Sequence, residues 1–130
     1  MKDLSIYIHI PYCQYQCRYC SFFTVIGKPK NVPLYFRALE REIEEYRNEA
    51  KEYIIRTIYF GGGTPSLVNA HHIESIINKI KTTFNVEDNV DISIETNPES
   101  LDEEKLDIYK RIGVNRLSIG LQASKDKLLR

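Results

Sequence analysis

The stretch SIYIHIPYCQYQCRYC, residues 5–20, contains the first strand of the expected fold and the residues with the most specific chemistry. Its first half, Ser5–Ile10, alternates strictly between isoleucine and other side chains. A period of two is typical of a strand with one buried face, so the isoleucines share one face, while Tyr7 and His9 share the other. The sequence therefore begins with a strand that carries polar groups on one side.

The second half of the same stretch contains every cysteine of the chain, in a C-x3-C-x2-C spacing: Cys13, Cys17 and Cys20. An odd number of cysteines crowded into one loop is a poor disulfide framework and a good metal or redox site. Three thiolates on one short loop can hold three corners of a cubane iron–sulfur cluster and leave its fourth iron open. The spacing thus points to chemistry as well as to a fold.

Beyond this stretch, the pattern switches repeatedly between strand and helix periods. Further strands are expected at residues 57–60, 91–95 and 115–122. Helices are expected after Asn31, Asn69 and Asp102, which can act as N-caps, and the third helix should stop at Gly113. A further helix would begin at Ser124. Repeated strand–helix units predict an α/β fold with about four parallel strands and helices on the outer face.

The strand patterns favour part of a barrel over a flat, doubly covered sheet. Strand 91–95 alternates isoleucines with Ser93 and Glu95, and strand 115–122 alternates apolar residues with Ser118, Gly120 and Gln122. A sheet buried on both faces would be apolar throughout. Here the polar face can line a ligand cavity. The distinctive residues also follow strand ends, where α/β sites assemble: the cysteine loop, Gly61–Pro65, Glu95–Pro98 and Gln122.

Composition narrows the classes of partner and location. The 130 residues include 18 basic and 18 acidic side chains, so charge gives no reason to expect nucleic acid or an anionic membrane as partner. The hydrophobic fraction of 42% is typical of a globular chain. No run approaches the roughly 18 apolar residues of a membrane span, and no secretory signal precedes the first strand. A cytoplasmic protein is therefore expected.

Five motifs in register resemble the radical S-adenosylmethionine (SAM) superfamily. They are YIHIPYC at 7–13, CRYC at 17–20, YFGGGTP at 59–65, IETNP at 94–98 and GVNRLSIGLQ at 113–122. More narrowly, the chain is similar to the oxygen-independent coproporphyrinogen III oxidase group and its haem-chaperone branch. The resemblance covers nearly the whole chain, from about Leu4 onward.

The resemblance implies the amino-terminal part of a partial (β/α)6 barrel and two cofactors. A [4Fe–4S] cluster would be held by Cys13, Cys17 and Cys20, and SAM would chelate its open iron. An electron from the cluster would then cleave SAM to methionine and a 5′-deoxyadenosyl radical. Residues matching the SAM-binding motifs are Tyr7, the backbone of Tyr19, Gly62, Gly63, Thr64, Glu95 and Gln122. Implied partners are an electron donor such as a flavodoxin or ferredoxin, and haem or a porphyrinogen.

Alternatives remain open at this point. The cysteines could bind structural zinc with His9 as fourth ligand, although such sites usually use paired cysteines from two places. Within the superfamily, the oxidase pattern has a further cysteine where this chain has Phe22. That departure favours the haem-chaperone branch, whose members bind and deliver haem, over an oxidase that decarboxylates coproporphyrinogen.

The length suggests that residues 1–130 are the amino-terminal portion of a radical SAM core domain. A closed α/β barrel takes about 250 residues, and this chain supplies four expected strands. We expect the fourth strand to present an open apolar edge. We also expect the isolated chain to lack a complete catalytic cycle, because the remaining strands and a substrate or haem domain would be missing.

Overall fold

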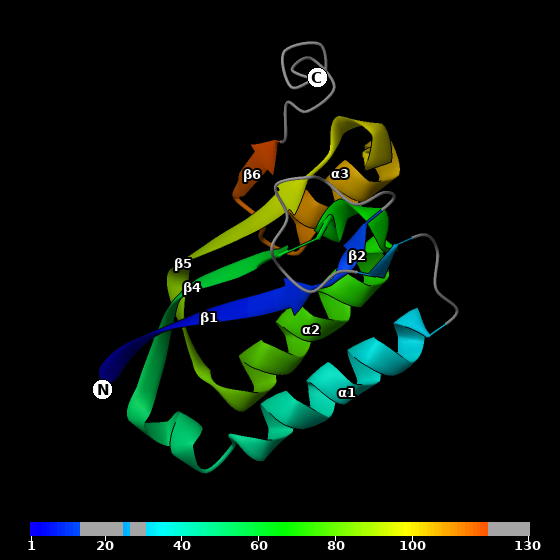
Figure 1. Cartoon of the computed structure of the whole chain (residues 1–130). Coiled ribbons are helices and arrows are strands. Elements are labelled where there is room, and N and C mark those ends of the chain that lie inside the picture. The colour runs from blue at the N-terminus through cyan, green and yellow to red at the C-terminus, as the bar shows by residue number, and fades with distance from the viewer. Residues whose placement is uncertain (14–24, 27–30, 120–130) are drawn as a thin grey trace, which may run out of the picture.

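The computed structural model describes residues 1–13, 25–26 and 31–119 (Figure 1). Its strands are β1 (Lys2–Ile10), β2 (Tyr12–Cys13), β3 (Val25–Ile26), β4 (Tyr53–Gly62), β5 (Asn85–Thr96) and β6 (Arg116–Ile119). Its α-helices are α1 (Val32–Glu45), α2 (Ala70–Thr83) and α3 (Glu103–Arg111). Short 3-10 helices are η1 (Glu49–Glu52), η2 (Pro65–Leu67) and η3 (Pro98–Ser100).

The main sheet has the order β1-β4-β5-β6, and all its neighbouring strands are parallel. Helices α1 and α2 lie side by side along one face of it (Figure 1). Parallel neighbours joined through helices are what the repeated strand–helix pattern predicts, because each connection must cross back over the sheet. The predicted α/β fold with four parallel strands is confirmed.

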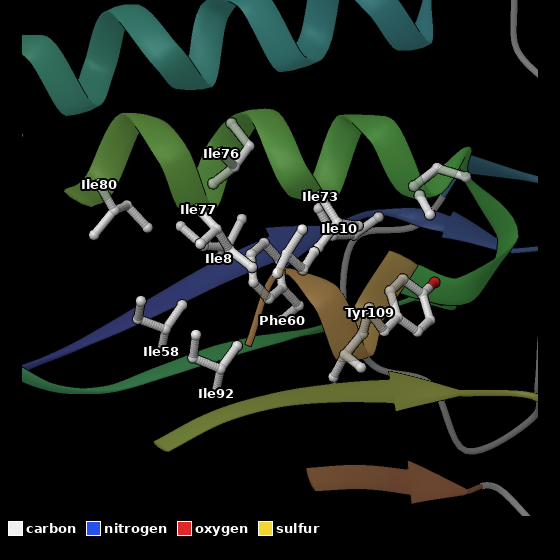
Figure 2. Packing of buried hydrophobic residues seen from close by; sticks show 14 of the residues in the cluster. Ile8, Ile10, Ile58, Phe60, Ile73, Ile76, Ile77, Ile80, Ile92 and Tyr109 are labelled. Carbon is white, nitrogen blue, oxygen red and sulfur yellow. The ribbon is translucent and has the colours of Figure 1, made fainter. Parts of the chain in front are cut away.

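The core lies between this sheet and α2. Figure 2 shows isoleucines of the strands facing isoleucines of α2, and the buried set includes Ile8, Ile10, Ile58, Phe60, Ile73, Ile76, Ile77, Ile80, Ile92 and Tyr109. The alternation in β1 has the predicted effect: Ile8 and Ile10 are buried, whereas Tyr7 is 53% exposed. Branched apolar side chains at every second strand position thus fix which face takes the helices.

The helix ends mostly follow the sequence signals. The Asn69 side chain accepts a hydrogen bond from the His71 amide (3.0 Å), and the Asp102 side chain accepts one from the Lys105 amide (2.7 Å). Gly113 has φ +97° just after α3, as a helix-ending glycine should. Asn31 occupies the cap position of α1 but makes no side-chain cap bond. Its backbone lies outside the extended conformation that a capping side chain needs.

Three strands are longer than the pattern predicts: β1 begins at Lys2 rather than Ser5, with a register shift between Leu4 and Ser5. β4 and β5 extend well before residues 57 and 91, and the pairing shifts register between Ile55 and Thr57. Such an irregularity breaks the alternation by which a strand is recognised, while parallel pairing continues past it. The two-stranded sheet of β2 and β3 was not predicted, because a strand of two residues is too short to show a periodic pattern.

β6 is the part of the predicted fourth strand that the structure describes. It pairs with β5, and its apolar residues Leu117 and Ile119 are 36% and 50% exposed. Among the described strands, β6 is the outer one of this sheet; the predicted open edge stays a prediction. Gly120, Leu121, Gln122 and the helix expected from Ser124 lie outside the described residues. None of the described helices is long and apolar enough to cross a membrane.

Candidate functional site

Aromatic and polar side chains from three strands gather on the sheet face opposite the helices. Tyr7 of β1 is paired with Tyr59 of β4, and their rings stack with centroids 5.9 Å apart and planes 19° apart. The Tyr7 hydroxyl lies 3.1 Å from Nδ1 of His9, two residues on along the same strand face. On β5, Glu95 lies two residues beyond Ser93, the partner of Tyr59 in the sheet. We call Tyr7, His9, Tyr59 and Glu95 the polar cluster.

Helix α1 fixes the end of β1. The Tyr35 hydroxyl donates a hydrogen bond to the backbone carbonyl of His9. Tyr35 is half-buried, and burial is the largest cause that raises the pKa of its phenol, to about 12, so the hydroxyl remains a donor at neutral pH. His9 is thereby held where β1 ends and the cysteine segment begins.

Glu95 is the carboxylate of the polar cluster, and its surroundings are partly apolar. Burial raises the pKa of Glu95, while a hydrogen bond from Tyr59 and the charge of His9 act in the opposite direction. Burial also raises the pKa of Tyr59, and the negative charge of Glu95 adds to this rise. A desolvated carboxylate with one phenol donor is suited to bind a cationic or hydroxyl-bearing ligand.

The glycine run at the end of β4 leaves space for this cluster. A Cβ on Gly61 would lie 2.3 Å from Oε1 of Glu95, and one on Gly62 would lie 2.1 Å from Nδ1 of His9. Gly62 also has φ +28°, a conformation that disfavours other residues. A Cβ on Gly63 would lie 2.6 Å from the Tyr12 carbonyl oxygen. Each glycine therefore admits a different close neighbour.

Two backbone hydrogen bonds join the glycine run to the start of the cysteine segment. The Gly63 amide donates to the Ile10 carbonyl and the Thr64 amide donates to the Tyr12 carbonyl, each over 2.7 Å. They continue the contact between β1 and β4 past Ile10 to Tyr12 of β2, the residue before Cys13. Because these amides are already bonded within the protein, a ligand here would meet the Thr64 side chain and the glycine Cα atoms instead.

A small cavity of about 160 Å³ brings several predicted site residues together. It lies between the ends of β4, β5 and β6 and is lined by Gly63, Thr64, Glu95, Thr96, Asn97, Ser118 and Ile119. Its walls carry hydroxyl, amide and carboxylate groups, so it can bind a polar ligand through several hydrogen bonds.

A lysine ties together the two loops that form this cavity. Nζ of Lys105 donates to the carbonyl of Ser66 (2.6 Å) after the glycine run and to the carbonyl of Ser100 (2.8 Å) after β5. The Ser66 hydroxyl is fully buried and accepts a hydrogen bond from the Asn97 amide (3.0 Å). Burial lowers the pKa of Lys105, and Asp102 opposes this shift. The network holds the loops after β4 and β5 at a fixed separation.

The structure gathers five of the predicted site residues at one end of the sheet: Tyr7, Gly62, Gly63, Thr64 and Glu95. The predicted positions Cys17, Tyr19, Cys20 and Gln122, and also Phe22, lie outside the described residues. Within the described part of the chain, no group of three or more histidine, cysteine or acidic side chains could hold a metal ion. Sequence reasoning missed Tyr59 and Lys105. Tyr59 could have been found from its position two residues before Gly61, whereas Lys105 resembles any surface lysine of a helix.

Known proteins resemble this chain in family profile, in sequence and in structure. The sequence profile of the radical SAM superfamily matches residues 7–130. The chain is 38% identical over 133 residues to the heme chaperone HemW of Buchnera aphidicola (subspecies Acyrthosiphon pisum), covering 100% of this chain and 35% of that protein. It is 36% identical over 126 residues to the heme chaperone HemW of Bacillus subtilis, covering 96% and 33%.

A solved structure is similar as well. Coproporphyrinogen III oxidase (HemN) from Escherichia coli, described as a radical SAM enzyme, superposes with a TM-score of 0.85 at 30% identity. The match covers 93% of this chain and 28% of the oxidase. The chain therefore spans about a third of the length of the curated relatives it matches.

Proposed function

The chain belongs to the radical SAM superfamily, and on that premise we propose that it is the cluster- and SAM-binding part of a haem chaperone. Membership implies a [4Fe–4S] cluster and SAM as cofactors. In our proposal Cys13, Cys17 and Cys20 hold the cluster. Soft thiolates select iron–sulfur clusters, and three of them leave one iron for another ligand. When bound, such a cluster supplies the electron for the reductive cleavage of SAM.

The observation that carries the proposal is the joining of the cysteine segment to the glycine run beside the polar cluster. The bonds from Gly63 to Ile10 and from Thr64 to Tyr12 set the backbone just before Cys13 against the end of β4. SAM bound to an iron–sulfur cluster at this position would contact the polar side chains at the ends of the strands. The glycine run Gly61–Gly63, which we call the glycine cradle, also lets a ligand approach the backbone closely. A Cβ on any of the three glycines would collide with its neighbours.

We assign the binding of SAM to the residues around this cradle. Glu95 would accept hydrogen bonds from its cationic or hydroxyl groups, and the Thr64 hydroxyl would bind beside it in the cavity that both residues line. Tyr7 would contact SAM from β1, and Gly62 and Gly63 would admit it closely. The backbone of Tyr19 and the Gln122 side chain complete the proposed set.

The haem-chaperone assignment is supported by Phe22 and by the relatives' names. Phe22 stands where the oxidase pattern has a further cysteine, and several of the most similar curated proteins are named heme chaperones. An oxygen-independent coproporphyrinogen III oxidase is the second candidate, because the solved structure similar to this chain is such an oxidase. The whole protein would work in the cytoplasm with a flavodoxin or ferredoxin as electron donor.

Anaerobic reconstitution with iron and sulfide tests the proposal. We expect a brown protein with about four iron and four sulfide ions per chain, as the proposed cubane requires. A colourless protein that takes up one zinc ion instead would contradict it and favour the zinc alternative. Haem titration of the full-length protein, compared with an assay of coproporphyrinogen decarboxylation, separates the candidates. Haem binding without decarboxylation is the result expected for a chaperone.

A further inference from the structure

We propose that Tyr59 is a positioning residue for SAM: its ring stacks on Tyr7 and lies over the same bare backbone position, Gly61, as the Glu95 carboxylate, so that its hydroxyl can donate to that carboxylate and fix where it points. The inference rests on the proposed SAM-binding function of this sheet face. Tyr59 belongs to the polar cluster but is not among the residues that we propose to contact SAM.

The strand register makes Tyr59 and Glu95 diagonal neighbours. Tyr59 of β4 pairs with Ser93 of β5, and Glu95 follows Ser93 by two residues on the same face. Diagonal partners on a sheet face lie within reach of a long aromatic side chain. Ser93 between them is small, so it does not block the approach. The sheet itself therefore sets the two side chains together.

The glycine after Tyr59 allows the contact. A Cβ on Gly61 would lie 2.3 Å from Oε1 of Glu95 and 2.8 Å from Cε1 of Tyr59. Both side chains thus lie over the same bare backbone position. Any larger residue there would push the carboxylate away from the phenol. Gly61 leaves space for Tyr59 and Glu95, whereas Gly62 leaves space for His9 and Gly63 leaves space for the backbone of Tyr12.

The Tyr59 ring is held and its hydroxyl remains a donor. Stacking on Tyr7, with the planes 19° apart, restricts the ring from one side. Burial and the charge of Glu95 both raise the pKa of Tyr59, so its hydroxyl stays protonated at neutral pH. A carboxylate has two oxygens that accept hydrogen bonds, and a bond from Tyr59 leaves acceptor capacity for a ligand.

This arrangement matters for SAM because Glu95 lines the cavity beside Thr64. SAM carries an ammonium group and ribose hydroxyls, and both donate hydrogen bonds. A carboxylate already fixed by the phenol loses little side-chain freedom on binding, which favours affinity. Without the phenol the carboxylate would be free to rotate, and its burial would favour the protonated form.

The test compares Tyr59→Phe with Tyr53→Phe. The first variant keeps the stacked ring and removes the hydroxyl; the second removes a hydroxyl from the other end of the same strand. The titration of the Glu95 carboxyl is followed by 13C NMR without SAM, and SAM binding to the reconstituted chain is measured by equilibrium dialysis. The other titratable groups that interact with Glu95 are His9 and Tyr7, both on β1, and they are unchanged in both variants.

We expect the pKa of Glu95 to rise further in Tyr59→Phe and the dissociation constant for SAM to increase about tenfold, as for the loss of one hydrogen bond to a charged group. Tyr53→Phe should match the wild type in both. An unchanged Glu95 titration, or an unchanged SAM affinity despite a shifted titration, would overturn the inference. Failure of the wild-type chain to bind SAM would instead contradict the proposed function itself.

Discussion

The two faces of the sheet are built from the same strands and have opposite properties. On the helix side, Ile58 and Ile92 are fully buried against α2 (Figure 2). On the other side, Tyr7 is 53% exposed and Glu95 is half-buried with a raised pKa. Burial of the isoleucines supplies stability at roughly 25 cal/mol per Å² of apolar surface. The polar face contributes less stability and holds the groups that can bind a ligand.

A substitution on one face of the sheet should therefore leave the other face largely intact. Alternation along a strand separates the two sets of side chains, so the core and the site share backbone but few contacts.

Loss of a single cysteine should have the largest effect, and it should fall on the site alone. Cys17→Ser removes one of three proposed ligands, and a serine hydroxyl is a poor substitute for a soft thiolate. We expect iron and sulfide content after reconstitution to fall to background, while the circular dichroism of the unloaded chain stays that of the wild type. Tyr53→Phe is the control. A variant that keeps a full cluster would remove Cys17 from the ligand set.

Ile77→Ala damages the opposite face. Ile77 is fully buried between α2 and the sheet, so truncation leaves a cavity and should lower the free energy of unfolding by about 2–5 kcal/mol. Urea unfolding measures it. Leu34→Ala is the comparison, since Leu34 is 61% exposed and its truncation should cost less than about 0.5 kcal/mol. Equal losses in the two variants would contradict the placement of the core.

Lys105→Met tests the link between the loops that form the cavity. The variant leaves the carbonyls of Ser66 and Ser100 without their donor, which should cost about 1–3 kcal/mol. Amide hydrogen exchange should also rise in residues 64–67 and 97–101. Lys110→Met changes an exposed lysine of the same helix and should do neither. Unchanged exchange in both loops would show that Lys105 does not hold them.

Glu95→Gln should have the smallest effect on stability, with a sign opposite to that of the core variant. Because burial raises the pKa of Glu95 above its usual 4.5, the charged carboxylate destabilises the folded chain at pH 7. This penalty fades as the pH falls through the raised pKa, and it is gone below the usual pKa of the unfolded chain. The variant should be equally stable or more stable at pH 7, by less than about 1 kcal/mol, and should lose this advantage in acid. Urea unfolding at both pH values decides it, with exposed Glu52→Gln as control.

Much of the fold was predictable because its signals are local. The alternation around Tyr7 and His9, the caps at Asn69 and Asp102, and the stop at Gly113 each act within a few residues. The predicted extents of β1, β4 and β5 were too short, since the register shifts near Leu4 and Ile55 depend on the neighbouring strand. A local sequence pattern does not show which strand lies beside it or in what register.

The candidate site was predictable where a motif carries its chemistry and hidden where only tertiary contact reveals it. The glycine run and Glu95 stand in motifs, and the structure brings them together. Tyr59 and Lys105 matter through residues distant in sequence, Glu95 and Ser66 respectively. The hydrogen bonds from the Gly63 and Thr64 amides to Ile10 and Tyr12 could not be predicted from the sequence either. They leave these two amides unable to donate to a ligand.

In our proposal the polar sheet face and the cysteine segment form one site for a [4Fe–4S] cluster and SAM. Electron paramagnetic resonance of the reconstituted, reduced chain, recorded with and without SAM, tests it most directly. We expect a reduced [4Fe–4S] signal whose g-values change when SAM is added, and no such change in the Glu95→Gln variant at the same SAM concentration. A wild-type signal that SAM leaves unaltered would contradict it.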